Sequence, residues 1–193
     1  MSQHVRPALT MLFALSIITG VLYPLLVTGI GQALFPAQAN GSIIVRKGEA
    51  VGSTLIGQPF ASPKYFWSRL SATQPFPYNA SASTGSNVGP LNPALLAAAK
   101  GRIDALRAAD PPNDAPIPVD LVTSSASGLD PGISPAAALY QVPRVARARN
   151  MSEAKLRELV KRYTDPRGLG ILGEPGVNVL ELNIALDGLE EER

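Results

Sequence analysis

The hydrophobic and polar positions divide this chain into a long apolar N-terminal stretch and a mixed remainder. No charged residue occurs from Pro7 to Val45, and residues 8–35 consist mostly of Leu, Ile, Val, Phe and Ala. As an α-helix this stretch would be about 42 Å long, which exceeds the hydrocarbon core of a bilayer, about 30 Å thick. We therefore expect a short tail at 1–7, a transmembrane helix at 8–35 and a soluble domain at 36–193.

Small residues and a proline mark the middle of the expected span. Ser16 and Gly20 are four residues apart, a spacing that lets a neighbouring helix approach closely. We identify both as candidate partner-binding residues. Pro24, one turn later, is expected to kink the helix.

A cleaved signal peptide is the alternative to a retained anchor. Ala37-Gln38-Ala39 resembles a cleavage site, and its use would remove residues 1–39 and leave a secreted or periplasmic binding or assembly protein. The apolar core of a signal peptide is usually about 7–15 residues long. The run here is nearly twice as long, which favours the anchor.

Charge counts leave the orientation of the anchor open. Arg6 precedes the span, and Arg46 and Lys47 follow it, so the positive-inside rule gives no decision. The short tail with Arg6 resembles a signal anchor. This resemblance favours a cytoplasmic N-terminus and an extracytoplasmic soluble domain.

Helix-start signals occur three times in the remainder. Asn92-Pro93 and Ser134-Pro135 each place a capping side chain before a proline, and Ser152 provides a third cap. Each signal predicts a helix that begins directly after it. Pro143 is expected to kink or restart the second of these helices.

Short strands and a long loop are also predicted. Strands are expected at 42–46, 50–56, 65–67 and 119–123, and a loop at 74–90. Leu180, Leu182, Ile184 and Leu186 alternate with Glu181, Asn183, Ala185 and Asp187, which predicts a further strand with one buried face. The mixture indicates a single, loop-rich α+β soluble domain.

Composition excludes several kinds of chemistry. The chain has no Cys and one His, His4, which rules out disulfides, Cys nucleophiles, Ser-His-Asp triads and multi-histidine metal sites. The net charge of +2 forms no basic stripe, so we expect no nucleic-acid partner. No glycine-rich phosphate motif and no Asp-Lys-Thr-Gly phosphorylation motif occurs. We expect no catalytic residue and no metal ligand.

Two aspartates remain as an acid–base alternative. Asp120 and Asp130 flank a Ser- and Gly-rich turn, and a pair of carboxyl groups there would suit general acid–base chemistry. Aspartates that cap turns are far commoner, and we favour that interpretation.

Residues 141–170 carry a local excess of positive charge. Two i,i+4 ion pairs on the helix after Ser152 indicate that part of this charge lies on a solvated face. Arg144, Arg147 and Arg149 form a cluster without such pairing, which suits an acidic partner surface or a phosphate. Arg147 and Arg149 are our partner-binding candidates, with plain solvation as the alternative.

Ordered sequence blocks along nearly the whole chain carry a family resemblance. They are Arg6-Pro7-Ala8-Leu9, Ile56-Gly57-Gln58-Pro59-Phe60, Tyr65-Phe66-Trp67-Ser68-Arg69, Gly85-Ser86-Asn87, Gly89-Pro90-Leu91-Asn92-Pro93, Val119-Asp120-Leu121-Val122-Thr123, Gly128-Leu129-Asp130-Pro131, Gln141, Arg144-Val145-Ala146 and Gly173-Glu174-Pro175. In these blocks the chain resembles the KdpC family, the C subunits of the bacterial Kdp potassium-transporting P-type ATPase. Leu70, Gly132 and Gly176 depart from the pattern of that family, which usually has Pro, His and Arg there.

The resemblance implies a non-catalytic subunit of an ATP-driven, high-affinity potassium uptake complex in the bacterial inner membrane. Its partners would be membrane lipid, the potassium-translocating A subunit, the ATP-hydrolysing B subunit and the small F subunit. It would act as a catalytic chaperone that raises the ATP affinity of the B subunit and stabilises the complex. No tightly bound cofactor is implied, and ATP would be shared with the B subunit.

Gln141 and Arg144 are the nucleotide-binding candidates that the resemblance implies, through the block Tyr-Gln-x-x-Arg. The residues alone offer a structural alternative, in which Gln141 bonds a carbonyl freed near Pro143. An extracytoplasmic domain would not reach cytoplasmic ATP. Its effect on ATP affinity would then act through conformational coupling between subunits.

Overall fold

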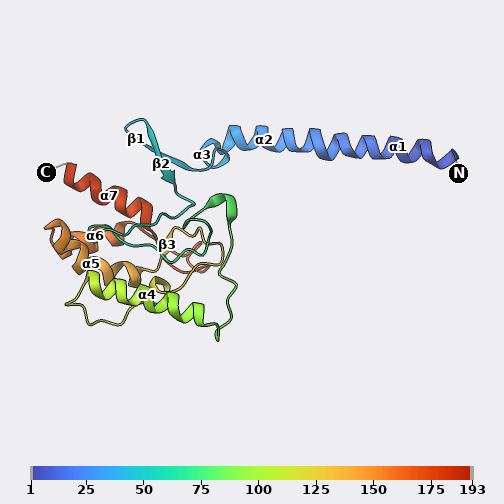
Figure 1. The fold of residues 1–193 in the computed structure, drawn as a ribbon. Coiled ribbons are helices and arrows are strands. Elements are labelled where there is room, and N and C mark those ends of the chain that lie inside the picture. Colours follow the sequence, from blue (N-terminus) through green and yellow to red (C-terminus); the bar gives the residue numbers. More distant parts are fainter. Residues whose placement is uncertain (1, 192–193) are drawn as a thin grey trace. The chain divides into compact units, whose positions relative to one another are not determined.

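The computed structural model describes residues 2–191, and the chain divides into two compact units between Val51 and Gly52 (Figure 1). The architecture is the expected one, a long apolar N-terminal helix followed by a mixed helix-and-sheet region. The first unit also takes in residues 36–51, which we expected in the soluble domain.

The first unit begins with one continuous helix, drawn in blue in Figure 1. Helix α1 (Ser2–Ile17), the π-helical segment η1 (Ile18–Leu22) and α2 (Tyr23–Leu34) follow one another without interruption. Residues 2–7, expected as a tail, are already helical. Gln3–Leu34 is 32 residues long and apolar enough to cross a membrane, and none of its most apolar window is buried. By length and composition it is a candidate membrane span.

A short helix and a β-hairpin complete the first unit. Helix α3 (Pro36–Ala39) precedes strands β1 (Ile43–Arg46) and β2 (Glu49–Ser53), which pair with each other. Lys47 and Gly48 form the connection with φ of 52° and 84°, and two-residue hairpin turns of this kind require positive φ at both positions. The hairpin confirms the strand expected at 42–46 and the first part of the one expected at 50–56, whose residues 54–56 lie in a turn.

The second unit contains four longer helices and a small antiparallel sheet. The elements are η2 (Ala80–Ala82), α4 (Pro93–Ala109), η3 (Val119–Leu121), β3 (Gly132–Ile133), α5 (Pro135–Arg149), α6 (Glu153–Arg162), β4 (Thr164–Asp165), β5 (Gly176–Asn178) and α7 (Val179–Glu191). The sheet order is β3-β5-β4, with Val177 opposite both Ile133 and Thr164.

Polar caps set the three predicted helix starts. The side chains of Asn92, Ser134 and Ser152 accept hydrogen bonds from main-chain N–H groups one turn into α4, α5 and α6. Proline follows the first two caps, as the sequence predicts. Helix α5 does not restart at Pro143: it is one helix from Pro135 to Arg149 with Pro143 inside it.

The strands predicted at 119–123 and at 180–186 are wrong. Residues 119–121 form a 3₁₀ turn after Pro118, in which Val122 N–H bonds Val119 O locally and leaves no ladder to a neighbour. Residues 180–186 belong to helix α7, whose start is capped by the Asn178 side chain through the N–H groups of Leu180 and Glu181. The alternation of apolar and polar residues over 180–187 predicted a strand, but Val179, Leu182 and Leu186 also follow helical spacing, and all three are buried.

The core of the second unit surrounds α5. Helix α6 packs against it, and α5 also contacts β5 and η3. The fully buried side chains in this cluster are Phe66, Leu121, Ala137, Ala138, Val142, Val145, Leu156, Val177, Val179, Leu182 and Leu186. Among these apolar side chains lie polar ones, Gln141, Arg144 and Asn183, each at most 3% exposed. These buried polar groups define the candidate site.

Candidate functional site

The site is the segment Pro63–Ser68, which begins in a turn at Pro63-Lys64 and continues as chain that belongs to no helix or strand. Side chains from three helices hold it. Two carboxamides bind its centre. Phe66 N–H donates to Asn183 Oδ1 at 2.9 Å, and Asn183 Nδ2 donates back to Phe66 O at 2.9 Å. Trp67 forms the same exchange with Gln141, at 2.8 and 3.1 Å. Each amide therefore takes the place that a neighbouring strand would occupy.

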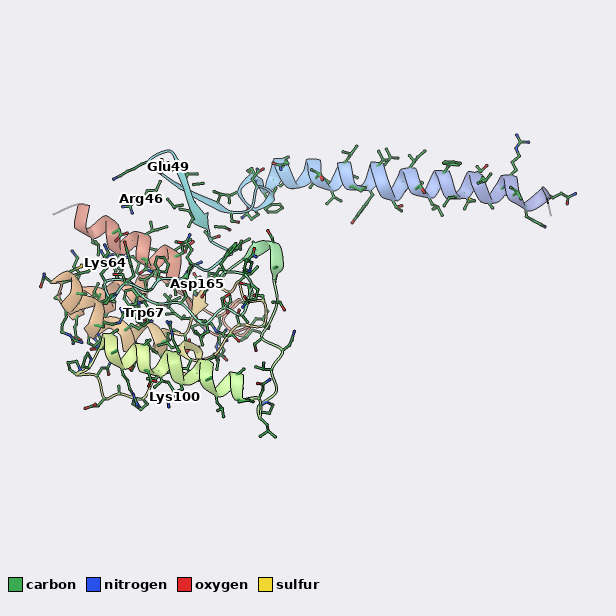
Figure 2. All side chains as sticks on the ribbon, viewed as in Figure 1. Arg46, Glu49, Lys64, Trp67, Lys100 and Asp165 are labelled. Atoms are coloured by element: carbon green, nitrogen blue, oxygen red, sulfur yellow. The ribbon has the colours of Figure 1, made fainter. Side chains whose placement is uncertain are left out.

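This arrangement corrects the strand expected at 65–67. Residues 65–67 belong to no strand, and the main-chain partners of Phe66 and Trp67 are side chains of α7 and α5 and not a second strand. Buried main-chain N–H and C=O groups need partners, and here Gln141 and Asn183 provide them. Figure 2 shows Trp67 within the body of the second unit.

Arg144 closes the site from α5. Its guanidinium donates to Pro63 O at 2.5 Å, Tyr65 O at 3.0 Å and Gln141 Oε1 at 2.6 Å. It also lies 4.6 Å from the ring centroid of Trp67, which is within the range of a cation–π contact. Burial lowers the pKa of Arg144 to about 10, so the side chain is still charged at neutral pH.

Two further arginines complete the set. Arg102, on α4, donates to Ser68 O at 2.6 Å and Leu121 O at 3.1 Å and lies 4.9 Å from the Trp67 ring. Arg149 donates to Lys64 O at 2.7 Å and pairs with Asp187 at 2.7 Å. Burial lowers the pKa of Arg102 as well. Three cationic side chains thus hold the carbonyls of a single segment.

The expected cluster of unpaired arginines does not form. Arg144 and Arg149 point into the fold, where they are 3% and 6% exposed. Arg147 pairs with Asp110, a carboxylate whose side chain is almost fully buried. The Arg147 side chain is about half exposed, so it is the member of the three best placed to meet a partner.

Two members of the site, Asn183 and Arg102, were not among the residues that the sequence singled out. Asn183 was assigned to a strand, where its side chain would have faced solvent. Arg102 gave no local signal, although it shares a face of α4 with buried Leu106, four residues on. Buried arginines that bond main-chain carbonyls have no sequence pattern of their own, because their partners lie far away in the chain.

Ser16 and Gly20, the partner-binding candidates on the long N-terminal helix, lie on the surface of the first unit. Ser16 is in the last turn of α1, and Gly20 is inside η1. Both are exposed, and no atom lies within 4 Å of the position that a Cβ on Gly20 would take. Their role in partner binding stays a prediction.

Asp120 and Asp130 line a cavity of about 560 Å³ together with Arg69, Gly132, Glu174 and Gly176. Asp120 accepts from Ser134 N–H at 2.7 Å. Asp130 accepts from Gly132 N–H and from Arg69, both at 2.9 Å. Asp130 caps its own turn, as we favoured, whereas Asp120 binds the N–H of Ser134, the residue directly before helix α5. Within residues 2–191, no group of three His, Asp or Glu side chains is placed to hold a metal ion.

Comparisons with known proteins agree over nearly the full length. A family model described as "KdpC: K+-transporting ATPase, c chain" matches residues 5–188. A protein of Methylococcus capsulatus named "Potassium-transporting ATPase KdpC subunit" is 65% identical over 189 residues, 98% of this chain and 100% of its own. Proteins of the same name from Polaromonas naphthalenivorans and Sorangium cellulosum are 64% and 63% identical, over 98% and 97% of this chain and 97% and 99% of their own.

Proposed function

Because this chain belongs to the KdpC family, the c chains of K⁺-transporting ATPases, we propose that it is a non-catalytic subunit of a bacterial Kdp potassium-uptake complex. Its partners are the A, B and F subunits and membrane lipid, in the inner membrane. The helix Gln3–Leu34 suits a single membrane anchor. The family does not favour the alternative, a secreted protein cleaved after Ala39.

The proposed role is that of a catalytic chaperone that raises the ATP affinity of the B subunit. If this chain binds the ATP-bound conformation of the pump better than the ATP-free one, linkage requires that ATP binds more tightly in its presence. A coupling of about 1–3 kcal/mol changes affinity about 5–150-fold. No contact between this chain and ATP is needed for that effect.

One observation supports the indirect route. The nucleotide candidates Gln141 and Arg144 are 1% and 3% exposed, and both are occupied by the main chain of Pro63–Trp67. A nucleotide that contacted them would first have to displace Trp67 and break these hydrogen bonds. Direct nucleotide contact by the two residues stays a prediction, and the indirect route is the one we favour.

The test is ATP binding by the purified pump with and without this chain. We expect the dissociation constant for ATP to rise at least about fivefold when the chain is omitted. An unchanged constant, with potassium transport intact, would overturn the chaperone role. Omission of the chain must leave the B subunit folded, which its circular dichroism spectrum reports.

A photoreactive ATP analogue separates the direct from the indirect route. In the complete complex we expect the label on the B subunit alone. Label on this chain within α5, removed by an excess of ATP, would establish direct contact and overturn the indirect route.

We further propose that the N-terminus is cytoplasmic and the second unit extracytoplasmic. Protease sites at exposed Arg157 and Arg162 on α6 report this. Cleavage in spheroplasts but not in inverted vesicles is the expected result, and the reverse pattern would place the domain in the cytoplasm.

Of the three arginines Arg144, Arg147 and Arg149, we propose Arg147 for contact with a partner subunit, because its side chain is half exposed.

A further inference from the structure

The hydrogen-bond ladder of the N-terminal helix is broken near its middle. In an α-helix the N–H of Tyr23 would bond Thr19 O, but in η1 it bonds Ile18 O, one residue further back. Pro24 follows directly and has no N–H. Regular α-helix resumes with α2 at Tyr23, so carbonyls from Leu22 onward again have partners four residues ahead.

The break leaves fewer main-chain N–H donors than carbonyl acceptors in this part of the helix. The carbonyls of Thr19, Gly20 and Val21 lie between the last π-helical bond and the first bond of α2. The N–H groups that would serve them belong to residues 23, 24 and 25. Tyr23 is committed to Ile18, and Pro24 has no N–H, so Leu25 alone remains. Two of the three carbonyls lack a ladder partner.

Side chains of the same helix do not fill the gap. The hydroxyl of Thr19 donates backwards to Leu15 O at 2.7 Å, and that of Thr10 donates to Arg6 O at 3.0 Å. Gly20 has no side chain to cover the carbonyls, and its surroundings are open. Residues 19–21 are exposed, so the free acceptors lie on an uncovered stretch of the helix beside Gly20.

These unpaired carbonyls lie at the depth of the membrane where such groups are least favourable. Residues 19–21 lie near the middle of Gln3–Leu34, at a depth where a bilayer holds no water. Unpaired main-chain polar groups are strongly unfavourable there. Carbonyls freed in membrane helices find partners on neighbouring helices, on Ser or Thr side chains, in ordered water or through a local change of helix type. The break thus requires a donor that this helix does not provide.

We propose that the carbonyls of Thr19–Val21 accept hydrogen bonds from a polar side chain on a transmembrane helix of another pump subunit. The donor is a hydroxyl or carboxamide, because such groups bond across membrane helices without burying a charge. Gly20 lets that helix approach, and Ser16 lies one turn away on the same face. This inference rests on the proposed membership of the pump and names the chemistry of the contact.

Three substitutions in the full chain test it, through the amount of partner subunit that co-purifies in mild detergent. Gly20→Leu covers the carbonyls. Gly29→Leu is the matched control, since Gly29 is also a helix glycine with nothing within 4 Å. Pro24→Ala keeps the small residues but returns one N–H to the ladder, which leaves the partner's donor one free acceptor in place of two. We expect Gly20→Leu to reduce co-purification at least tenfold, Pro24→Ala about 3- to 20-fold, and Gly29→Leu not at all.

The results distinguish failure of the hydrogen bond, of the proposed partner and of the proposed function. If Gly20→Leu reduces binding and Pro24→Ala does not, the contact is packing alone and the hydrogen-bond inference is overturned. A photo-crosslinker at Val21 should capture another subunit; capture of a second copy of this chain would overturn the proposed partner. If the unsubstituted chain co-purifies with no pump subunit, it is the proposed function that fails.

Discussion

The carboxamide of Gln141 and the main chain of Trp67 exchange two hydrogen bonds, at 2.8 and 3.1 Å, across 74 residues of sequence. The same carboxamide oxygen accepts from Arg144 at 2.6 Å, and its nitrogen also donates to Ala137 O at 3.2 Å. Gln141 therefore has a structural role in joining α5 to the segment Pro63–Ser68. This is different from the freed carbonyl near Pro143 that the sequence suggested as its partner.

Gln141→Leu is expected to destabilise the second unit by about 2–4 kcal/mol, because Trp67 N–H, Trp67 O and Arg144 would each lose a partner in a buried environment. Thermal unfolding of the detergent-solubilised chain measures this as a lower Tm. Glu158→Gln, at an exposed position of α6, is the control and should leave Tm unchanged. A Gln141→Leu chain as stable as the original would contradict the assigned role.

Arg144→Lys is expected to cost about 2–4 kcal/mol although it conserves the charge. A planar guanidinium reaches Pro63 O, Tyr65 O and Gln141 Oε1 together and stacks on Trp67, whereas an ammonium group does not have this fork. Denaturant unfolding gives the free-energy difference. Arg157→Lys, at an exposed ion pair on α6, should change stability by less than about 0.5 kcal/mol.

Stability at high pH depends on Tyr78. Its hydroxyl donates to Arg69 O at 2.6 Å, and burial raises the pKa of Tyr78 above its ordinary value of 10. Above pH 10 the unfolded chain loses this proton while the folded chain keeps it, so the contribution of Tyr78 is complete below pH 10 and falls as pH rises toward the folded pKa.

Tyr78→Phe isolates that effect. The substituted chain should be less stable by about 1–2 kcal/mol at pH 7–9, because Arg69 O loses its donor. Above pH 10 the difference should shrink, as denaturant unfolding at a series of pH values would report. A difference that stays constant up to pH 11 would show that the Tyr78 pKa is not raised.

Two glycine substitutions should act in opposite directions. Gly128 has φ of +70°, and a Cβ there would lie 2.7 Å from Thr84 O and 2.6 Å from Thr73 Cγ2, so Gly128→Ala should destabilise by about 2 kcal/mol or more. Gly101 lies inside α4 with no atom near its Cβ position. Gly101→Ala should stabilise by about 0.5–1 kcal/mol. Thermal unfolding curves of the two variants and the unsubstituted chain give the change in Tm for each substitution. Two changes of the same sign would contradict the prediction.

Local signals predicted the local parts of this fold. The long apolar helix, the hairpin and the starts of α4, α5 and α6 depend on neighbouring residues, such as a cap followed by proline, and the structure contains each of them. Helix α7 was predicted wrongly because Leu180–Leu186 satisfies two periods at once. The choice between them depends on the Asn178 cap and on burial of Val179, Leu182 and Leu186 against other elements.

The candidate site was predicted only in part. Gln141 and Arg144 were singled out, and the structure brings them together. Their main-chain partners lie about 75–80 positions away, at Pro63–Trp67, and no spacing rule connects such distant residues. For the same reason Arg102 and Asn183 were missed, since a buried arginine or asparagine is distinguished by its tertiary contacts and not by its neighbours in sequence.

The chain has a single tryptophan, Trp67, and its ring lies within 5 Å of two guanidinium groups. It is therefore a native fluorophore where α4, α5 and the segment Pro63–Ser68 meet. Its emission will report loosening of that junction without any label attached. A change in emission that precedes loss of helix during denaturation would identify this junction as the first part of the domain to open.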